Sequence, residues 1–250
     1  MVDPKRDEPI RFVSEFVRRL RRTPTSRRRL FRGQNTDKPL LPRIVRLAEK
    51  RGIPFADVTD IERKMLLRFR RESLPMLGVI RPETDWELMS IAQHQGMPTR
   101  LLDWTANALA GLWFAVSNDP PDDESHGVVW ALEVDPANEK TPTRSDDIFD
   151  LKLTYVFQPF HLDRRIVAQS GWFSVHRYAQ RRNRFLPLEQ HEKYAKALMR
   201  FVVPRERFDA LRQELRLLGI SQASMFPDLS GLGADIQAEF IDSWRPLATI

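Results

Sequence analysis

Residues 127–134 read Gly-Val-Val-Trp-Ala-Leu-Glu-Val (GVVWALEV), and this run decides the expected fold class. β-branched and aromatic side chains at this density are typical of a β-strand. Three further stretches have the same character: 154–157 (TYVF), 165–175 (RIVAQSGWFSV) and 197–203 (ALMRFVV). Helical patterns lie on both sides of these strands in the chain. The sequence therefore predicts an α+β fold, in which one domain holds a mixed or antiparallel sheet flanked by helices.

Apolar residues at helical spacing mark the helices. The clearest pattern is IRFVSEFVRRLRR at 10–22, whose arginines lie mostly off the apolar face, so an amphipathic basic helix is expected there. Thr59 with Glu62 and Thr84 with Glu87 both match the capping-box pattern of a helix start. The expected helices are 60–72, 84 to a stop at Gly96, an N-cap at Thr105 to Ser117, 205–218, and a short one after Ser230.

These elements divide the chain into three expected parts. They are a basic helical extension in residues 1–27, a main domain in 28–232, and a C-terminal helix or tail packed on that domain in 233–250. No apolar run approaches the ~18 residues that cross a bilayer. The first residues, MVDPKRDEP, lack the apolar stretch of a signal peptide. We expect a cytoplasmic protein with no membrane partner.

Composition excludes several kinds of chemistry. The chain has no cysteine, which excludes disulfides, cysteine-ligated zinc, iron–sulfur clusters and a thiolate nucleophile. The five histidines are scattered without the H-x-x-H or H-E-x-x-H spacing of a zinc site. No G-x-S-x-G motif of a serine hydrolase occurs. The sequence thus predicts no metal centre.

The positive charge is concentrated at the N-terminus. The formal net charge is +6, but residues 1–32 hold eleven Lys or Arg against four acids, and the rest of the chain holds 29 bases and 30 acids. This excess favours either a solvated helix face or contact with nucleic acid through Arg18, Arg19 and Arg22. In the second case Trp86, Trp104 and Trp172 could stack on bases, although tryptophans at helical spacing are usually core residues.

The densest group of polar residues lies in QHQGMPTRLLDWT at 93–105. We expect a loop here that joins two helices. His94, in the last turn of the first helix, lies where a cation is stabilised, and the second helix would begin at Thr105 and favour an anion. Arg100 and that helix start would form an anion pocket, with His94 as general acid or charge-stabilising donor and Asp103 as its partner. The structural interpretation is that Arg100 pairs with Asp103 and Trp104 is core.

Two other stretches complete the expected site. Phe31-Arg32-Gly33-Gln34 places Arg32 at the end of a strand, where glycine allows close approach of a ligand. RIVAQSGWF at 165–173 places Gln169 on the same strand face as Arg165, unless Gly171 makes a bulge. The expected ligand-binding residues are Arg32, Gln93, Thr99, Arg100, Thr105 and Gln169.

The same stretches carry a resemblance. Phe31-Arg32-Gly33, the 93–105 loop, RIVAQSGWF and GISQASMFPDLSGL at 219–232 together resemble the FRG domain over roughly residues 28–232. The resemblance implies an intracellular protein of bacteria, archaea or phages, a setting compatible with phage defence. It carries over the motif residues Arg32, His94, Thr99, Arg100, Asp103, Trp104, Thr105 and Gln169. It implies no particular reaction.

We consider two functions from different classes. One is a nucleotide-using enzyme, with NAD as a candidate cofactor, because Arg-Gly on a strand beside a threonine-rich loop resembles the layout of ADP-ribosyltransferases. Their catalytic Glu would correspond to Glu192 or Glu239, each two residues after a Gln, a match that chance alone also gives. The alternative is a non-catalytic nucleic-acid-binding module. The expected partner is thus a phosphate-bearing small molecule or a nucleic acid.

Overall fold

A six-stranded sheet organises the chain in the computed structural model, which describes residues 8–78, 81–119, 125–159, 168–178 and 185–242. The strand order is β4-β5-β2-β1-β3-β6, and every neighbouring pair is antiparallel. The strands are β1 (Arg29–Gln34), β2 (Leu101–Thr105), β3 (Gly127–Glu133), β4 (Tyr155–Phe157), β5 (Gly171–Val175) and β6 (Leu198–Val203). The expected α+β fold with an antiparallel sheet is therefore confirmed.

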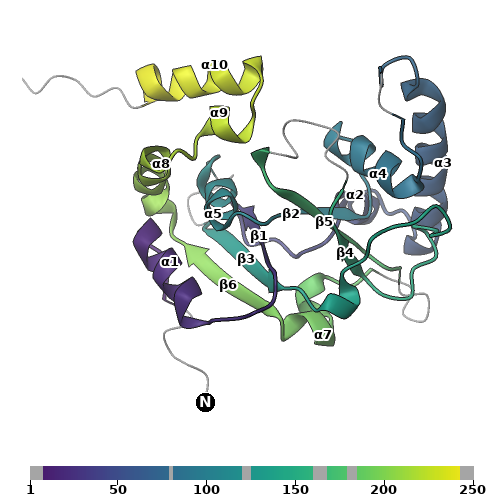
Figure 1. Cartoon of the computed structure of the whole chain (residues 1–250), viewed down its shortest axis with the longest axis horizontal. Helices are drawn as coiled ribbons and strands as arrows, with labels where there is room; N and C mark the ends of the chain where they lie inside the picture. Colours follow the sequence, from purple (N-terminus) through teal and green to yellow (C-terminus); the bar gives the residue numbers. More distant parts are fainter. Residues whose placement is uncertain (1–7, 79–80, 120–124, 160–167, 179–184, 243–250) are drawn as a thin grey trace, which may run out of the picture.

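Helices flank this sheet (Figure 1). They are α1 (Val13–Arg22), α2 (Arg43–Lys50), α3 (Phe55–Ser73), α4 (Asp85–His94), α5 (Ala108–Val116), α7 (Glu192–Ala195), α8 (Phe208–Leu217), α9 (Gln222–Met225) and α10 (Leu229–Gln237). The 3₁₀ turns are η2 (Pro136–Asn138), η4 (Leu188–Gln190) and η5 (Arg205–Arg207), and η6 (Ala238–Asp242) is a π-helical turn. None of the described helices is long and apolar enough to cross a membrane.

Strand alternation divides the core between the two faces of the sheet. On one face, α1, α5 and α8 cover β1, β3 and β6, and α3 and α4 cover β2, β4 and β5. α5 lies so close to β1 that a Cβ at Gly33 would stand 2.1 Å from the Gly111 carbonyl oxygen. On the other face, Leu102, Trp104 and Trp130 pack with Leu188 of η4 and Tyr194 of α7. The central strands are therefore buried on both faces.

Local end signals set several helix boundaries as expected. Thr84 accepts a hydrogen bond from the Glu87 N–H at 3.1 Å, and the Glu87 carboxylate accepts one from the Thr84 N–H at 3.3 Å. This capping box begins α4. Gly96 after α4 and Gly219 after α8 have φ angles of 86° and 80°, which glycine adopts without strain.

Residues 101–105 form a central strand, so the expected loop and the expected helix start at Thr105 are both wrong. Leu101 and Leu102 are buried on opposite faces of β2, and only Asp103 in this strand is exposed. Helix α5 begins three residues later, where the Asn107 side chain accepts hydrogen bonds from the N–H groups of Leu109 and Ala110 at 2.9 and 3.3 Å. Residue 105 is thus a strand end and not a helix cap.

Thr59 and Glu62 do not form the expected capping box. Helix α3 already begins at Phe55, after Pro54, so both residues lie inside it. Their side chains bind Arg100 instead.

The N-terminal helix packs on the main sheet. The Phe16 ring lies edge-on to Phe31 and Phe201, with centroid distances of 6.3 and 5.2 Å.

Arg165, predicted to share a strand face with Gln169, lies outside the described residues. The expected division at residues 27 and 232 stays a prediction.

Candidate functional site

Arg32 and Asp103 meet where the two central strands join. β1 and β2 pair at Phe31 and Thr105. Arg32 is the next residue of β1, and its Nη1 donates a hydrogen bond of 2.9 Å to the Asp103 carbonyl oxygen on β2. The same Nη1 lies 3.6 Å from Asp103 Oδ2. The guanidinium is thereby held against β2 next to an exposed carboxylate.

Arg32 is largely buried but incompletely bonded. Its side chain is 16% exposed, whereas that of Asp103 is 61% exposed. Its Nε is buried and has no hydrogen-bond partner among the described residues. Trp130, the register partner of Arg32 on β3, has a buried indole N–H that also lacks a hydrogen-bond partner among the described residues. Register partners share a sheet face, so two unsatisfied donors lie on neighbouring side chains.

Gln93 and Thr99 fix the orientation of the Asp103 carboxylate. The Thr99 hydroxyl is buried and donates to Gln93 Oε1 at 2.6 Å. This bond turns the amide group so that Gln93 Nε2 donates to Asp103 Oδ2 at 3.2 Å. Gln93 comes from the end of α4, and Thr99 precedes β2. The exposed carboxylate is thus held by a chain of bonds that begins inside the protein.

Helix α2 adds positive charge beside this pair. Arg46 is half-buried and its side chain makes no hydrogen bond or ion pair with the described residues, and Arg43 Nη1 donates to the Gly96 carbonyl oxygen at 2.9 Å. Burial lowers the pKa of Arg32 and of Arg46, each guanidinium is further disfavoured by a neighbouring arginine, and Asp103 opposes both shifts. Guanidinium groups stay charged at neutral pH despite such shifts. We call Arg32, Arg46, Gln93, Thr99 and Asp103 the Arg32–Asp103 cluster.

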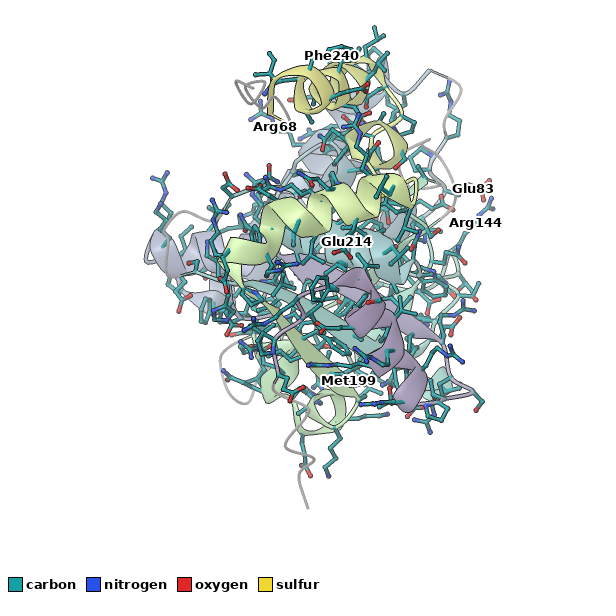
Figure 2. The ribbon with its side chains drawn as sticks, turned by 90° about the vertical axis from the view of Figure 1, so that its left-hand side faces the viewer. Arg68, Glu83, Arg144, Met199, Glu214 and Phe240 are labelled. Atoms are coloured by element: carbon teal, nitrogen blue, oxygen red, sulfur yellow. The ribbon has the colours of Figure 1, made fainter. Side chains whose placement is uncertain are left out.

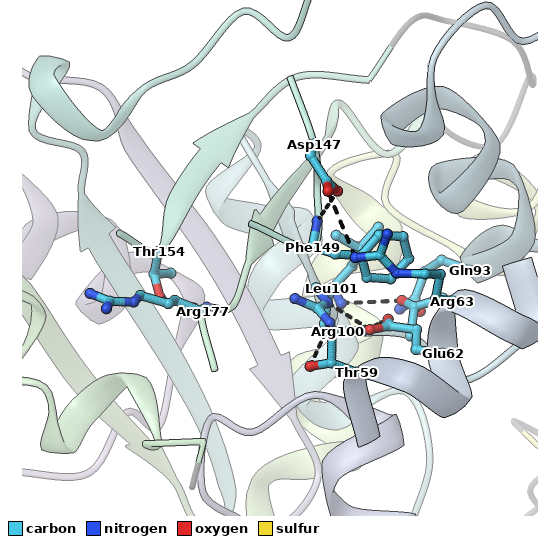
Figure 3. Close-up of polar contacts among 11 residues, drawn as sticks. Thr59, Glu62, Arg63, Gln93, Arg100, Leu101, Asp147, Phe149, Thr154 and Arg177 are labelled. Atoms are coloured by element: carbon cyan, nitrogen blue, oxygen red, sulfur yellow. Dashed lines mark hydrogen bonds and ion pairs between the residues drawn. The ribbon is translucent and has the colours of Figure 1, made fainter. Parts of the chain in front are cut away.

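Arg100 is not part of this cluster, contrary to the expected anion pocket. Its Nε lies 2.6 Å from Glu62 Oε2, and the two side chains are 1% and 0% exposed. Its backbone N–H donates to Glu62 Oε1 at 2.6 Å, and its Nη2 donates to the Thr59 hydroxyl at 3.2 Å. Figure 3 shows the guanidinium between these two α3 side chains, close to Phe149. The buried Glu62 carboxylate neutralises this arginine, whose buried Nη1 has no hydrogen-bond partner among the described residues. The two side chains form a structural ion pair that joins α3 to the start of β2.

Thr105 and Gln169 are also bonded within the protein. The Thr105 hydroxyl donates to the Gln169 carbonyl oxygen at 2.5 Å and accepts from the Asn107 N–H at 3.0 Å. The Gln169 side chain donates to the Met225 carbonyl oxygen at 3.1 Å. Both residues thus connect β2, α5 and α9, so their role in this structure is to stabilise the fold.

His94 follows Gln93 in the last turn of α4, where it was expected. Its role as a general acid stays a prediction.

Arg18 and Arg22 are exposed on α1, and Arg19 lies 3.7 Å from Glu8. Among the described residues, no group of three or more His, Cys, Asp or Glu could hold a metal ion.

A buried polar chain lies behind the cluster. The Trp104 indole N–H donates to Ser174 Oγ at 2.9 Å, and Ser174 Oγ lies 3.3 Å from His176 Nε2. Burial and, to a smaller extent, the charges of Arg32 and Arg100 lower the pKa of His176 to about 3. The imidazole is therefore neutral and adds no charge to the cationic side of the site.

The roles of three residues were not predicted from the sequence. Arg46 lies on α2, a helix for which no end signal was recognised, and Trp130 looks like any buried strand residue. Glu62 was assigned to a helix start. Each gains its role from a partner distant in the chain, so no local pattern indicates it.

Part of the chain resembles a known protein family. Residues 27–124 match the sequence model of the FRG domain. No curated protein and no solved structure gives a significant match. The matched segment contains every residue of the Arg32–Asp103 cluster. The expected resemblance to the FRG domain is therefore confirmed over residues 27–124.

Proposed function

We propose that the Arg32–Asp103 cluster binds a phosphate-bearing small molecule, and that this molecule is a nucleotide. The observation that carries the proposal is the charge imbalance: Arg46 disfavours the charge of Arg32, Arg43 disfavours that of Arg46, and Asp103 is the carboxylate that opposes both pKa shifts. Bringing an anion to two such guanidinium groups relieves their repulsion and forms charge-assisted hydrogen bonds.

Asp103 and Gln93 suggest a sugar beside the phosphate. A carboxylate with most of its surface exposed can accept hydrogen bonds from ribose hydroxyls, as acidic residues do in dinucleotide sites. The Gln93 amide holds that carboxylate in place. A ligand with phosphate at the arginines and a diol at Asp103 satisfies both halves of the cluster. These are the features of a nucleotide.

The finer proposal is a nucleotide-using enzyme with NAD as the candidate cofactor. Asp103 would act as the base that accepts a proton from a ligand hydroxyl, and His94, one residue after Gln93, would act as the acid. The two glutamates considered from the sequence are left out of this proposal. Glu239 pairs with Arg216 at 2.9 Å, and Glu192 lies 3.5 Å from Lys196.

Nucleic-acid binding is the second candidate function. It is favoured by Arg18 and Arg22 on α1, which are exposed and form no ion pair within the described part of the chain. Each phosphate that they neutralise should contribute about 0.9 to the slope of log affinity against log salt for duplex DNA. Replacing both with glutamine should remove this part of the salt dependence and leave nucleotide binding unchanged.

A thermal-shift screen tests the main proposal. The compounds are NAD, ADP-ribose, ATP, inorganic pyrophosphate, and adenosine as the uncharged control. The free energy of unfolding should rise by about 2.7 kcal/mol at a hundredfold excess over the dissociation constant. Arg46→Ala should reduce the shift, and Arg51→Ala, which removes an exposed arginine just after the same helix, should keep it. The proposal fails if no charged compound stabilises the wild type or if both variants respond equally.

A further inference from the structure

The face formed by α1, α8 and α10 carries an unusual share of exposed apolar side chains. Figure 2 shows the three helices on one side of the molecule, with Glu214 of α8 near the centre and Phe240 at the far end. Eight of the fourteen large apolar side chains exposed among the described residues belong to these helices, to the C-cap of α8 or to η6: Val17, Leu217, Leu218, Leu229, Leu232, Ile236, Phe240 and Ile241. Apolar patches of this kind on a protein surface mark sites of association.

The first part of this face is a groove between α1 and α8. It has a volume of about 830 Å³ and is lined by Val13, Ser14, Val17, Arg18, Arg21, Arg22, Glu214, Leu217 and Leu218. The Glu214 carboxylate is already used, because it accepts a hydrogen bond from the Val13 N–H at 2.8 Å. Arg18, Arg21 and Arg22 form no ion pair within the described ranges. The α1/α8 groove therefore combines apolar walls with uncompensated positive charge.

The second part of the face is the apolar stripe of α10 and η6. Leu229, Leu232 and Ile236 recur at i, i+3 and i+7, which places them along one side of α10, and Phe240 follows in the π-helical turn η6. Residues 228–241 contain three acids, Asp228, Asp235 and Glu239, and no lysine or arginine. Arg216 of α8 binds Asp235 and Glu239 at 3.4 and 2.9 Å. This contact fixes the acidic flank against α8 and leaves the apolar stripe exposed.

We propose that α10 of a second copy of this chain docks in the α1/α8 groove. An amphipathic helix binds an apolar groove through anchors at i, i+3 and i+7, the spacing that Leu229, Leu232 and Ile236 have. The groove is lined by three arginines and one glutamate, and the α10 segment carries three acids and no base, two of the acids being paired with Arg216 of α8, so the net charges of groove and segment are opposite in sign. Each copy carries both parts, and a reciprocal exchange forms a closed two-fold dimer. The apolar walls favour a helix over nucleic acid as the occupant, because a phosphate backbone offers nothing to cover them.

The test measures the mass of the protein in solution by sedimentation velocity across the micromolar range. Wild-type protein should form a dimer that weakens as salt is added. Ile236→Asp, in the stripe, and Val17→Asp, in the groove, should each give a monomer. Leu67→Asp, at an exposed apolar site on α3 outside this face, should keep the dimer. Thermal melting of each variant checks that it is folded.

A mixture of the two monomeric variants identifies the docking mode. The Val17→Asp copy keeps an intact stripe and the Ile236→Asp copy keeps an intact groove, so an equimolar mixture should form a dimer through one intact contact. Three outcomes would overturn the proposal. They are a wild-type monomer throughout the range, a wild-type dimer with no dimer in the mixture, and growth into open chains instead of a dimer.

Discussion

Replacing Arg100 with methionine should destabilise the fold by about 3–5 kcal/mol, the usual cost of removing one partner of a buried ion pair. The size follows from what the guanidinium binds. It makes a 2.6 Å bond to the Glu62 carboxylate and a 3.2 Å bond to the Thr59 hydroxyl, and both charged side chains are fully buried. Hydrogen bonds to charged groups are worth about 1.5–3 kcal/mol each, and the buried carboxylate left behind has a desolvation cost.

The loss should depend on pH in a particular direction. Burial raises the pKa of the Glu62 carboxyl, and Arg100 opposes that rise, so removing Arg100 raises the pKa further. The folded variant then holds a proton that the unfolded chain releases above its ordinary carboxyl pKa. Its stability must fall as pH rises through that window. The deficit relative to wild type should therefore be smaller at about pH 5 than at about pH 8.

Urea denaturation followed by circular dichroism at both pH values measures this effect. Thermal melting should show a midpoint lower by about 6–20 °C, given about 2–4 °C per kcal/mol for a chain of this size. The double variant Glu62→Leu, Arg100→Met should lose less stability than Arg100→Met and lose the added pH dependence, because no buried charge remains. A deficit below about 1 kcal/mol in Arg100→Met, equal at the two pH values, would refute the assignment of Arg100 as structural.

Two further predictions concern stability. Gly33→Ala should destabilise by about 1–3 kcal/mol or more, because its Cβ would stand 2.1 Å from the Gly111 carbonyl oxygen, whereas Gly233→Ala, with nothing within 4 Å, should be neutral or stabilising in the same melting experiment. Because the pKa of His176 is lowered from 6.5 to about 3, the folded state should lose stability as pH falls through that interval. His176→Gln should flatten this slope in urea titrations, and an unchanged slope would contradict a buried neutral imidazole.

Two equal sequence patterns show where sequence reasoning reaches its limit. Thr84 with Glu87 and Thr59 with Glu62 both match a capping box, and only the first pair begins a helix. The first pattern is satisfied by backbone groups within four residues. The second is decided by Arg100, 38 residues further along the chain from Glu62, and no local signal indicates that partner. Because this contact could not be recognised in the sequence, Arg100 was predicted to bind a ligand.

The sheet shows a similar division. β3 and β6 were predicted because their runs are long and rich in β-branched and aromatic residues. β2 was taken for a loop because it is short and carries Asp103 in its centre. Because β2 is buried on both faces, its sequence does not show the alternation of apolar and polar residues that marks a strand with one exposed face. Polar density did identify four of the five residues of the Arg32–Asp103 cluster, whereas Arg46 is contributed by a helix that was not foreseen.

The central claim is that Arg32 and Arg46 form an anion site around Asp103 and that Arg100 serves the fold. Calorimetric titration of the most stabilising nucleotide into wild type, Arg46→Ala and Arg51→Ala tests it most directly. Losing one charge-assisted contact of about 1.5–3 kcal/mol should weaken binding about 10- to 150-fold in Arg46→Ala. Arg51→Ala should bind as wild type does. Equal dissociation constants for the wild type and Arg46→Ala would contradict the claim.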